Sequence, residues 1–206
     1  MRKYIGILFL LLSLTAVAQT KAEIETALQN IDTPAKVKRL HTTHKTWNVE
    51  VVTLNSKEED TPKELISLQK GQATIIRSGE ATFHYKLLES SQGKEFRVGY
   101  IYLNGKELQK PQIDMFRSLI MERYEKGTSF KDLADTYNMD QNSKSEDLGW
   151  FKAGMMVPQF ESAIRAHQKG DIFTVDVDDR KWYYVVLKTY EDRVVDYLTF
   201  VKIKEQ

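Results

Sequence analysis

The sequence contains no cysteine, and this absence excludes several kinds of chemistry at once. Without thiols the chain can form no disulfide bond, no thiolate metal site and no cysteine nucleophile, so packing alone must stabilise the fold. The chain also lacks an excess of one charge, since 30 basic residues stand against 29 acidic residues. This balance argues against a nucleic-acid-binding protein. No metal, nucleotide or flavin motif is present either, and we expect no cofactor.

Long apolar runs are absent except at the start of the chain. Arg2 and Lys3 precede an apolar run over residues 5–18 that ends in Ala-Val-Ala. This order is typical of a secretory signal peptide (residues 1–18), cleaved before Gln19. A membrane anchor is the alternative, but it needs about 20 apolar residues, and the polar residues after position 18 make this run too short.

Cleavage would leave 188 of the 206 residues, with 28 basic and 29 acidic side chains after the loss of Arg2 and Lys3. No cysteine follows the apolar run, so we expect no lipid anchor. Cleavage removes the apolar run itself, so we expect no membrane span in the mature chain. The predicted location is the bacterial periplasm. The small-residue cleavage site followed by glutamine resembles exported proteins of the Bacteroidota.

The first half of the mature chain has the pattern of a small α+β region. His41 and His44, three apart, could bind a metal, but we interpret them as solvated linker residues. Apolar spacing, capping residues and turn signals predict the elements. They are helices over 22–31, from Pro34 and after Pro62, and strands over 47–54, 72–78 and 81–89.

The second half predicts a larger unit in which a strand is followed by three helices and a hairpin. The hairpin turn is placed at Asp178-Asp179. The elements are strands over 96–103, 172–177, 181–188 and, with weak alternation, 193–203, and helices from Pro111 to near Gly127, from Phe130, and from Pro158 to Gly170. This order indicates an α+β fold.

A possible internal repeat links the two halves. Val49–Glu58 resembles Val98–Glu107, and Gln69–Tyr85 aligns without a gap with Gln168–Tyr184. The first half would then be a degenerate copy of the second, although any strand–helix–hairpin unit looks somewhat like another. The expected organisation is a signal peptide (1–18), a helical segment (19–45), a small α+β region (46–93), a larger domain (94–192) and a C-terminal strand or tail (193–206).

The segment Phe130–Ile164 contains a motif of residues at fixed spacing. A Phe-x-x-Leu-Ala helix is followed by a polar loop ending in Asp-Leu-Gly, and then by Met-x-Pro-x-Phe-Glu at the start of a helix. The residues concerned are Phe130, Leu133, Ala134, Asp147, Leu148, Gly149, Met156, Pro158, Phe160 and Glu161. This pattern resembles the parvulin (PpiC-type) family of peptidyl-prolyl isomerases, and the likeness extends over about half of the mature chain. The resemblance implies a parvulin-like fold, an antiparallel sheet with three to four helices.

The resemblance implies a shallow apolar cup for proline formed by Leu148, Met156 and Phe160. Met156 and Phe160 stand four apart across a helix start, so both can face the same side. They could equally be ordinary core residues. The central polar group of the family corresponds here to Asp140, for which a structural role at the end of a helix is the alternative.

Two positions depart from the family pattern. Where relatives usually carry histidines on the first and last strands, this chain has Tyr100 and Tyr184. The loop before Asp147 also lacks the usual pair of glycines. Tyrosine hydroxyls can donate and accept hydrogen bonds, so Tyr100 and Tyr184 could preserve a polar network around Asp140. They could also be packing residues of a domain whose catalysis has weakened.

The resemblance thus predicts a peptidyl-prolyl cis-trans isomerase, with activity reduced by the two tyrosines, that assists the folding of exported proteins. Expected partners are proline-containing unfolded or nascent exported chains. The alternatives are a catalytically weak chaperone that holds such chains and an accessory subunit of an outer-membrane or secretion complex. Residues 104–110 contain two lysines and no arginine, so a phosphate-specific site is not expected.

Overall fold

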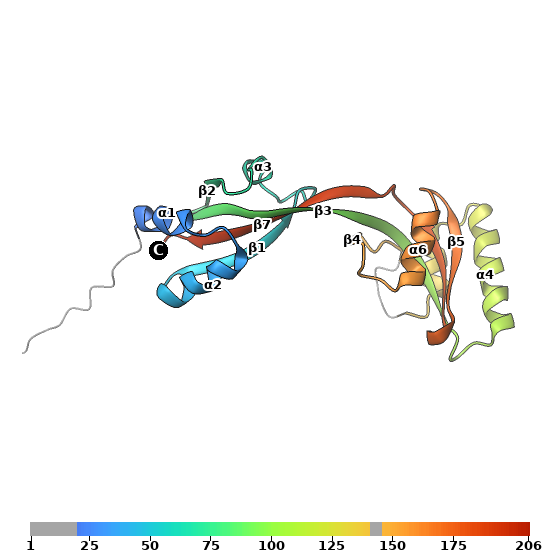
Figure 1. The fold of residues 1–206 in the computed structure, drawn as a ribbon. Helices are drawn as coiled ribbons and strands as arrows, with labels where there is room; N and C mark the ends of the chain where they lie inside the picture. Colours follow the sequence, from blue (N-terminus) through green and yellow to red (C-terminus); the bar gives the residue numbers. More distant parts are fainter. Residues whose placement is uncertain (1–19, 141–145) are drawn as a thin grey trace, which may run out of the picture. The chain divides into compact units, whose positions relative to one another are not determined.

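The structure, a computed structural model, describes residues 20–140 and 146–206, and the predicted signal peptide lies outside them. The α-helices are α1 (Lys21–Gln29), α2 (Pro34–Thr43), α3 (Lys63–Ile66), α4 (Lys110–Glu125), α5 (Phe130–Tyr137) and α6 (Pro158–Ala166), with a 3-10 helix η1 (Asp178–Arg180) (Figure 1). The strands are β1 (Asn48–Asn55), β2 (Ala73–Ser78), β3 (Ala81–Asn104), β4 (Trp150–Lys152), β5 (Ile172–Val177), β6 (Trp182–Lys188) and β7 (Arg193–Lys204). None of the helices within the described ranges has the length and apolar character needed to span a bilayer.

The chain divides into two compact units. Among the described residues, unit 1 contains residues 20–54, Glu58–Ser90 and Leu198–Gln206, and unit 2 contains Asn55–Lys57 and Ser91–Tyr197. Both β3 and β7 contribute residues to each unit. The segment boundaries expected from the sequence, and the internal repeat, stay predictions.

In unit 1, helices cover both faces of an antiparallel sheet. Leu87 and Leu88 are neighbours on β3, and side chains of adjacent strand residues point to opposite faces. Leu88 packs with the buried side chains of α1 and α2, whereas Leu87 packs with Leu65 of α3. The two helical layers therefore lie on opposite sides of this sheet, as the ribbon also shows (Figure 1).

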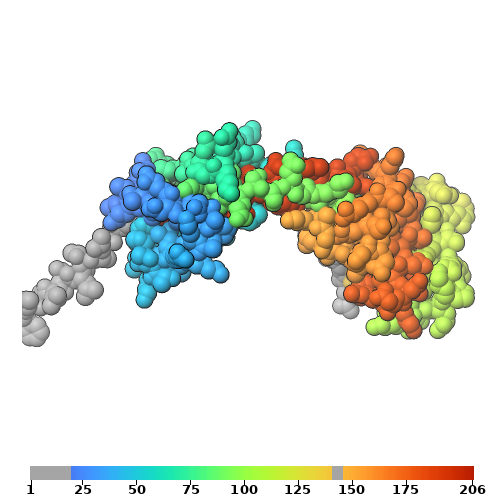
Figure 2. Space-filling model, viewed as in Figure 1, coloured from blue at the N-terminus to red at the C-terminus, as the bar shows by residue number. Residues whose placement is uncertain are grey.

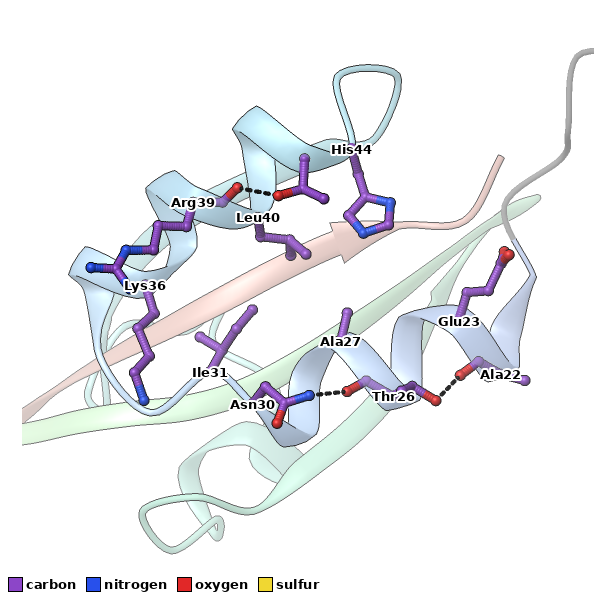
Figure 3. Close-up of a pocket in the computed structure, with 11 residues that line it drawn as sticks. Ala22, Glu23, Thr26, Ala27, Asn30, Ile31, Lys36, Arg39, Leu40 and His44 are labelled. Carbon is purple, nitrogen blue, oxygen red and sulfur yellow. Dashed lines mark hydrogen bonds between the residues drawn. The ribbon is translucent and has the colours of Figure 1, made fainter.

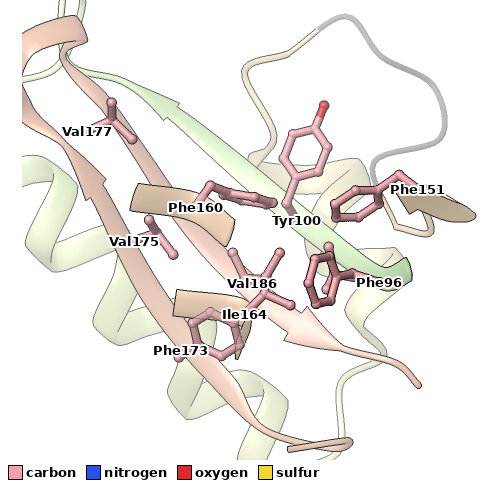
Figure 4. Close-up of a cluster of buried hydrophobic side chains, with 10 residues drawn as sticks. Phe96, Tyr100, Phe151, Phe160, Ile164, Phe173, Val175, Val177 and Val186 are labelled. Carbon is pink, nitrogen blue, oxygen red and sulfur yellow. The ribbon is translucent and has the colours of Figure 1, made fainter. Parts of the chain in front are cut away.

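In unit 2 the sheet also separates two clusters. Tyr100 on β3 packs with Phe160 and Ile164 of α6, as Figure 4 shows. Its neighbour Ile101 faces the other way and packs with side chains of α4 and α5. The strands β3, β6 and β5 are antiparallel neighbours, with Tyr102 opposite Tyr184. The α+β class with an antiparallel sheet is thus confirmed.

Two features of the strands differ from the expectation. The strands predicted over 81–89 and 96–103 are one continuous strand, β3, because its polar middle section finds partners. Glu95 is buried there, and its carboxylate accepts hydrogen bonds of 2.7 Å from both Asn55 and the Tyr197 hydroxyl. The short strand β4, which pairs with β3, was not predicted because three residues carry too little pattern.

Candidate functional site

A pocket of about 390 Å³ lies in unit 2, on the face of the sheet that α6 covers. All six residues singled out from the sequence line it: Tyr100, Asp140, Leu148, Met156, Phe160 and Tyr184. They come from β3, from β6, from α6 and from the two loops that follow α5 and β4. The structure therefore brings together residues that are up to 84 positions apart in the sequence.

Aromatic rings form the base of this pocket. The ring of Phe160 meets Tyr184 edge to face, with centroids 5.2 Å apart, and Tyr100 meets Tyr184 in the same way at 5.9 Å. Edge-to-face contacts of this kind stabilise aromatic pairs beyond the apolar area that they bury. The strand register explains the arrangement, because Tyr100 pairs with Val186 and Tyr102 with Tyr184 on neighbouring antiparallel strands. Tyr100 and Tyr184 are therefore diagonal neighbours on one face.

The polar side of the pocket is a hydrogen bond from the Tyr100 hydroxyl to Oδ2 of Asp140, at 2.5 Å. In Figure 4 this hydroxyl points away from the buried apolar cluster. Asn138 positions the acid, since its Oδ1 accepts a 2.8 Å hydrogen bond from the backbone N–H of Tyr102. The N–H of Met139 in turn donates to the carbonyl oxygen of Tyr102 at 2.9 Å. The segment after α5 is thus attached to the edge of β3, directly before Asp140.

Leu148 is held by the residues on either side of it. Arg97 on β3 donates to both carboxylate oxygens of Asp147, with Nε–Oδ1 2.9 Å and Nη2–Oδ2 2.5 Å. The hydrogen bond from Arg97 lowers the pKa of Asp147, although partial burial opposes this, and the N–H of Gly149 lowers it further. Gly149 has φ +70°, a backbone conformation that glycine adopts without strain. The N–H of Leu148 donates to the carbonyl of Val98 at 3.0 Å, which completes the attachment of this loop.

Met156 is positioned by a buried acid in α6. Oε1 of Glu161 accepts hydrogen bonds from the backbone N–H groups of Gly154 (2.7 Å) and Met156 (3.0 Å). Oε2 accepts one from Arg165 at 2.8 Å. Burial alone would raise the pKa of Glu161, but these three donors outweigh it and the pKa is lowered. The Glu of the sequence motif therefore shapes the loop from which Met156 reaches the pocket.

Tyr184 is a partly buried ionisable group of the pocket. Burial is the main cause that raises the pKa of its hydroxyl far above the usual value, and the neighbouring Tyr102, Tyr100 and Asp140 raise it further. Arg180 has a smaller, opposing effect. The hydroxyl therefore keeps its proton at any physiological pH and can act as a hydrogen-bond donor.

Four further residues line the pocket and were not found from the sequence: Met155, Val157, Arg180 and Trp182. Trp182 could have been found, because it stands two positions before Tyr184 on the same strand and so shares its face. Arg180 belongs to a turn, where periodicity gives no direction for a side chain. Met155 is 67% exposed and stands at the rim of the pocket.

A second pocket, of about 700 Å³, lies in unit 1 between α1 and α2 (Figure 3). It is larger, but it contains none of the predicted site residues. Its lining includes the apolar side chains of Ala27, Ile31 and Leu40, and His44, whose ring stacks on Trp47 at 4.0 Å. In the space-filling view these two helices form the blue part of the surface of unit 1 (Figure 2). Within the described part of the chain, no acidic and histidine side chains cluster in a way that could hold a metal ion.

Comparison with known proteins gives matches to one family. A family model described as the PPIC-type PPIase domain matches residues 85–190. Over 138 residues the chain is 29% identical to the protein named chaperone SurA from Alkalilimnicola ehrlichii, covering 62% of this chain and 32% of that protein. Over 134 residues it is 28% identical to foldase protein PrsA 1 from Bacillus cereus, covering 64% of this chain and 43% of that protein. The chain thus spans less than half the length of these curated relatives.

Solved structures with similarity to the chain have related names. A PpiC-type peptidyl-prolyl cis-trans isomerase domain is 23% identical, with a TM-score of 0.44, and the match covers 49% of this chain and 93% of that domain. PrsA from Bacillus subtilis is 28% identical, with a TM-score of 0.38, and the match covers 47% of this chain and 35% of that protein.

Proposed function

The chain belongs to the PPIC-type PPIase (parvulin) family, and on this premise we propose that it catalyses the cis–trans isomerisation of peptide bonds before proline. The observation that carries this proposal is the convergence of Leu148, Met156 and Phe160 with the Tyr100–Asp140 hydrogen bond in one pocket. A pyrrolidine ring is small and apolar, and this pocket offers an apolar surface beside a polar one.

The isomerisation requires no covalent chemistry from the protein. No bond is broken, and the barrier of about 18–20 kcal/mol arises because amide resonance is lost in the twisted state. A site that binds the twisted amide more tightly than either planar form is sufficient. A rate gain of about 10³–10⁵ requires roughly 4–7 kcal/mol of such preference.

In this mechanism each group has a defined part. Leu148, Met156 and Phe160 hold the proline ring, while the amide carbonyl turns out of the plane of the ring. Asp140, oriented by Tyr100, provides the electrostatic environment of the twisted amide. Tyr184 retains its proton and donates a hydrogen bond where histidine stands in relatives. The exchange of two histidines for tyrosines supports a slower enzyme than those relatives.

The cellular role follows from the same premise. We place the protein in the periplasm after cleavage of residues 1–18, where it assists the folding of unfolded or nascent exported chains that contain proline. Two relatives are named as a chaperone and a foldase, which supports this role. The alternative, a weakly catalytic chaperone or an accessory subunit of an outer-membrane or secretion complex, is favoured by one observation: both histidine positions are tyrosines.

The test is the cis-to-trans rate of an Xaa-Pro peptide with purified residues 19–206, compared with Asp140→Ala and Met156→Ala. Met115→Ala is the matched control, because Met115 is 57% exposed on α4 and is not part of the pocket. We expect the wild type to accelerate isomerisation and the two pocket variants to accelerate it about tenfold less or worse. A tenfold loss corresponds to about 1.4 kcal/mol of transition-state binding. The control should be as active as the wild type. A folded protein that binds proline peptides without accelerating them would support the chaperone alternative instead.

A further inference from the structure

Arg180 gives the pocket a charge that the sequence motif does not contain. Among the described residues that line the pocket, only Asp140 and Arg180 are charged, and Asp140 already accepts the hydrogen bond from Tyr100. The guanidinium of Arg180 lies over the ring of Trp182, with the carbon 4.8 Å from the ring centroid. Arg180 is exposed, and within the described part of the chain it forms no ion pair.

The turn that holds Arg180 is fixed at its far side. Lys181 has φ +56°, its N–H donates to the carbonyl of Asp178 at 3.1 Å, and its own carbonyl accepts from Gly105 at 2.9 Å. A side chain at Gly105 would approach the Tyr183 ring to 2.4 Å, so only glycine allows this close contact. The turn therefore holds the backbone of Arg180 in place, and stacking on Trp182 orients its planar guanidinium.

We infer that Arg180 makes this pocket selective for substrates with an acidic side chain adjoining the proline. The apolar cup can recognise the ring, but it cannot distinguish the residues on either side of it. A carboxylate beside the ring can meet the guanidinium of Arg180 in the two-pronged geometry that arginine and carboxylates share. This inference rests on the proposed function, since it assigns the substrate class of the same pocket.

The experiment uses four peptides that differ only by glutamate or glutamine, placed immediately before or immediately after the proline. Their isomerisation is followed by NMR exchange spectroscopy with residues 19–206, with Arg180→Gln and with Lys106→Gln. Lys106 is an exposed cation of unit 2 outside the pocket, so its removal changes the net charge by the same amount. Binding of the same peptides is measured separately by the intrinsic tryptophan fluorescence.

We expect kcat/KM to be about three- to fivefold higher for the glutamate peptide than for the glutamine peptide at one of the two positions. A ratio of this size corresponds to a solvent-exposed ion pair. This ratio should fall to about one in Arg180→Gln and persist in Lys106→Gln. It should also fall when the ionic strength rises from about 0.01 M to about 1 M, because the Debye length shortens from roughly 30 to 3 Å.

A ratio near one at both positions in the unchanged protein, or a ratio that survives in Arg180→Gln, would overturn the inference while leaving the isomerase proposal intact. Binding that prefers glutamate through Arg180 without any acceleration would support the inference and contradict the isomerase proposal. The two ideas therefore fail separately.

Discussion

The Arg97 guanidinium on β3 is paired with both carboxylate oxygens of Asp147, the residue immediately before Leu148 of the pocket. The pair joins the loop after α5 to the central strand of unit 2, and so the position of Leu148 depends on it. The two side chains are 28% and 36% exposed, which means that solvent weakens the interaction without abolishing it.

Replacement of Asp147 by asparagine should lower the free energy of unfolding by about 1 kcal/mol at pH 7, because Arg97 loses its charged partner. The pKa of Asp147 is lowered in the folded protein, so its contribution is complete above the unfolded pKa of about 3.9 and is lost as the pH falls through the lower folded value. Urea unfolding at several pH values should therefore show the wild type and the variant converging below about pH 4.

The control for this prediction is Asp135→Asn, which removes a carboxylate from an exposed pair with Lys131 on α5. That change should leave the unfolding free energy nearly unchanged at pH 7. A difference between wild type and Asp147→Asn that stayed constant down to the lowest pH would mean that the charge of Asp147 contributes nothing to stability.

The hydroxyl of Tyr100 can be tested apart from its ring. Tyr100→Phe keeps the edge-to-face contacts with Phe160 and Tyr184 but removes the hydrogen bond to Asp140. This bond is present without substrate, but Asp140 is exposed, so we expect its loss to lower the free energy of unfolding by only about 1 kcal/mol. Because Asp140 is no longer oriented, kcat/KM should fall about tenfold. Isomerisation kinetics and thermal unfolding measure the two effects.

Tyr102→Phe is the matched control, since it removes a hydroxyl two positions along the same face of β3. Its side chain packs on Tyr184 at 5.4 Å. Equal losses of activity in Tyr100→Phe and Tyr102→Phe would argue that the hydroxyl of Tyr100 has no special role and that both variants act through packing.

The residues that line the candidate site could be predicted from the sequence more easily than the course of the strands around them. Leu148, Met156 and Phe160 belong to a spaced motif that can be recognised in the sequence alone, and all three line the pocket. Arg180 could not be found in the same way, because the direction of a side chain in a turn depends on contacts such as that between Lys181 and Gly105.

The continuity of β3 could not be predicted either, because it too depends on contacts between residues distant in the sequence. A strand is recognised by apolar alternation, and the polar residues between Glu89 and Glu95 interrupt it. Glu95 is nevertheless buried, because residues distant in the sequence, among them Asn55 and Tyr197, satisfy its carboxylate. Long-range hydrogen bonds of this kind cannot be inferred from local pattern.

A close backbone contact predicts the effect of a methyl group at Gly99. A Cβ atom there would lie 2.3 Å from the carbonyl oxygen of Glu146 and 2.9 Å from the ring of Phe130. Since the nearer atom belongs to the backbone, Gly99→Ala must displace the loop that contains Leu148. We expect a loss of about 1–3 kcal/mol in unfolding free energy and a raised KM for proline peptides. Unchanged KM in the folded variant would contradict the dependence of the pocket on this loop.

Glu161 offers a test that separates its two acceptor oxygens. Glu161→Gln keeps one oxygen for the N–H groups of Gly154 and Met156 but loses the charged bond to Arg165. Glu161→Ala leaves both N–H groups without their acceptor, and an unsatisfied buried donor costs about 1–3 kcal/mol.

Urea unfolding should therefore give the highest free energy of unfolding for the wild type, a lower one for Glu161→Gln and the lowest for Glu161→Ala. The difference between the two variants should be larger than that between the wild type and Glu161→Gln. KM for a proline peptide should rise from wild type to Glu161→Gln to Glu161→Ala, because Met156 reaches the pocket from the loop that Glu161 holds. If the two variants were equally stable and bound peptide equally well, the N–H groups would have to be satisfied by water, and Glu161 would act only through its ion pair with Arg165.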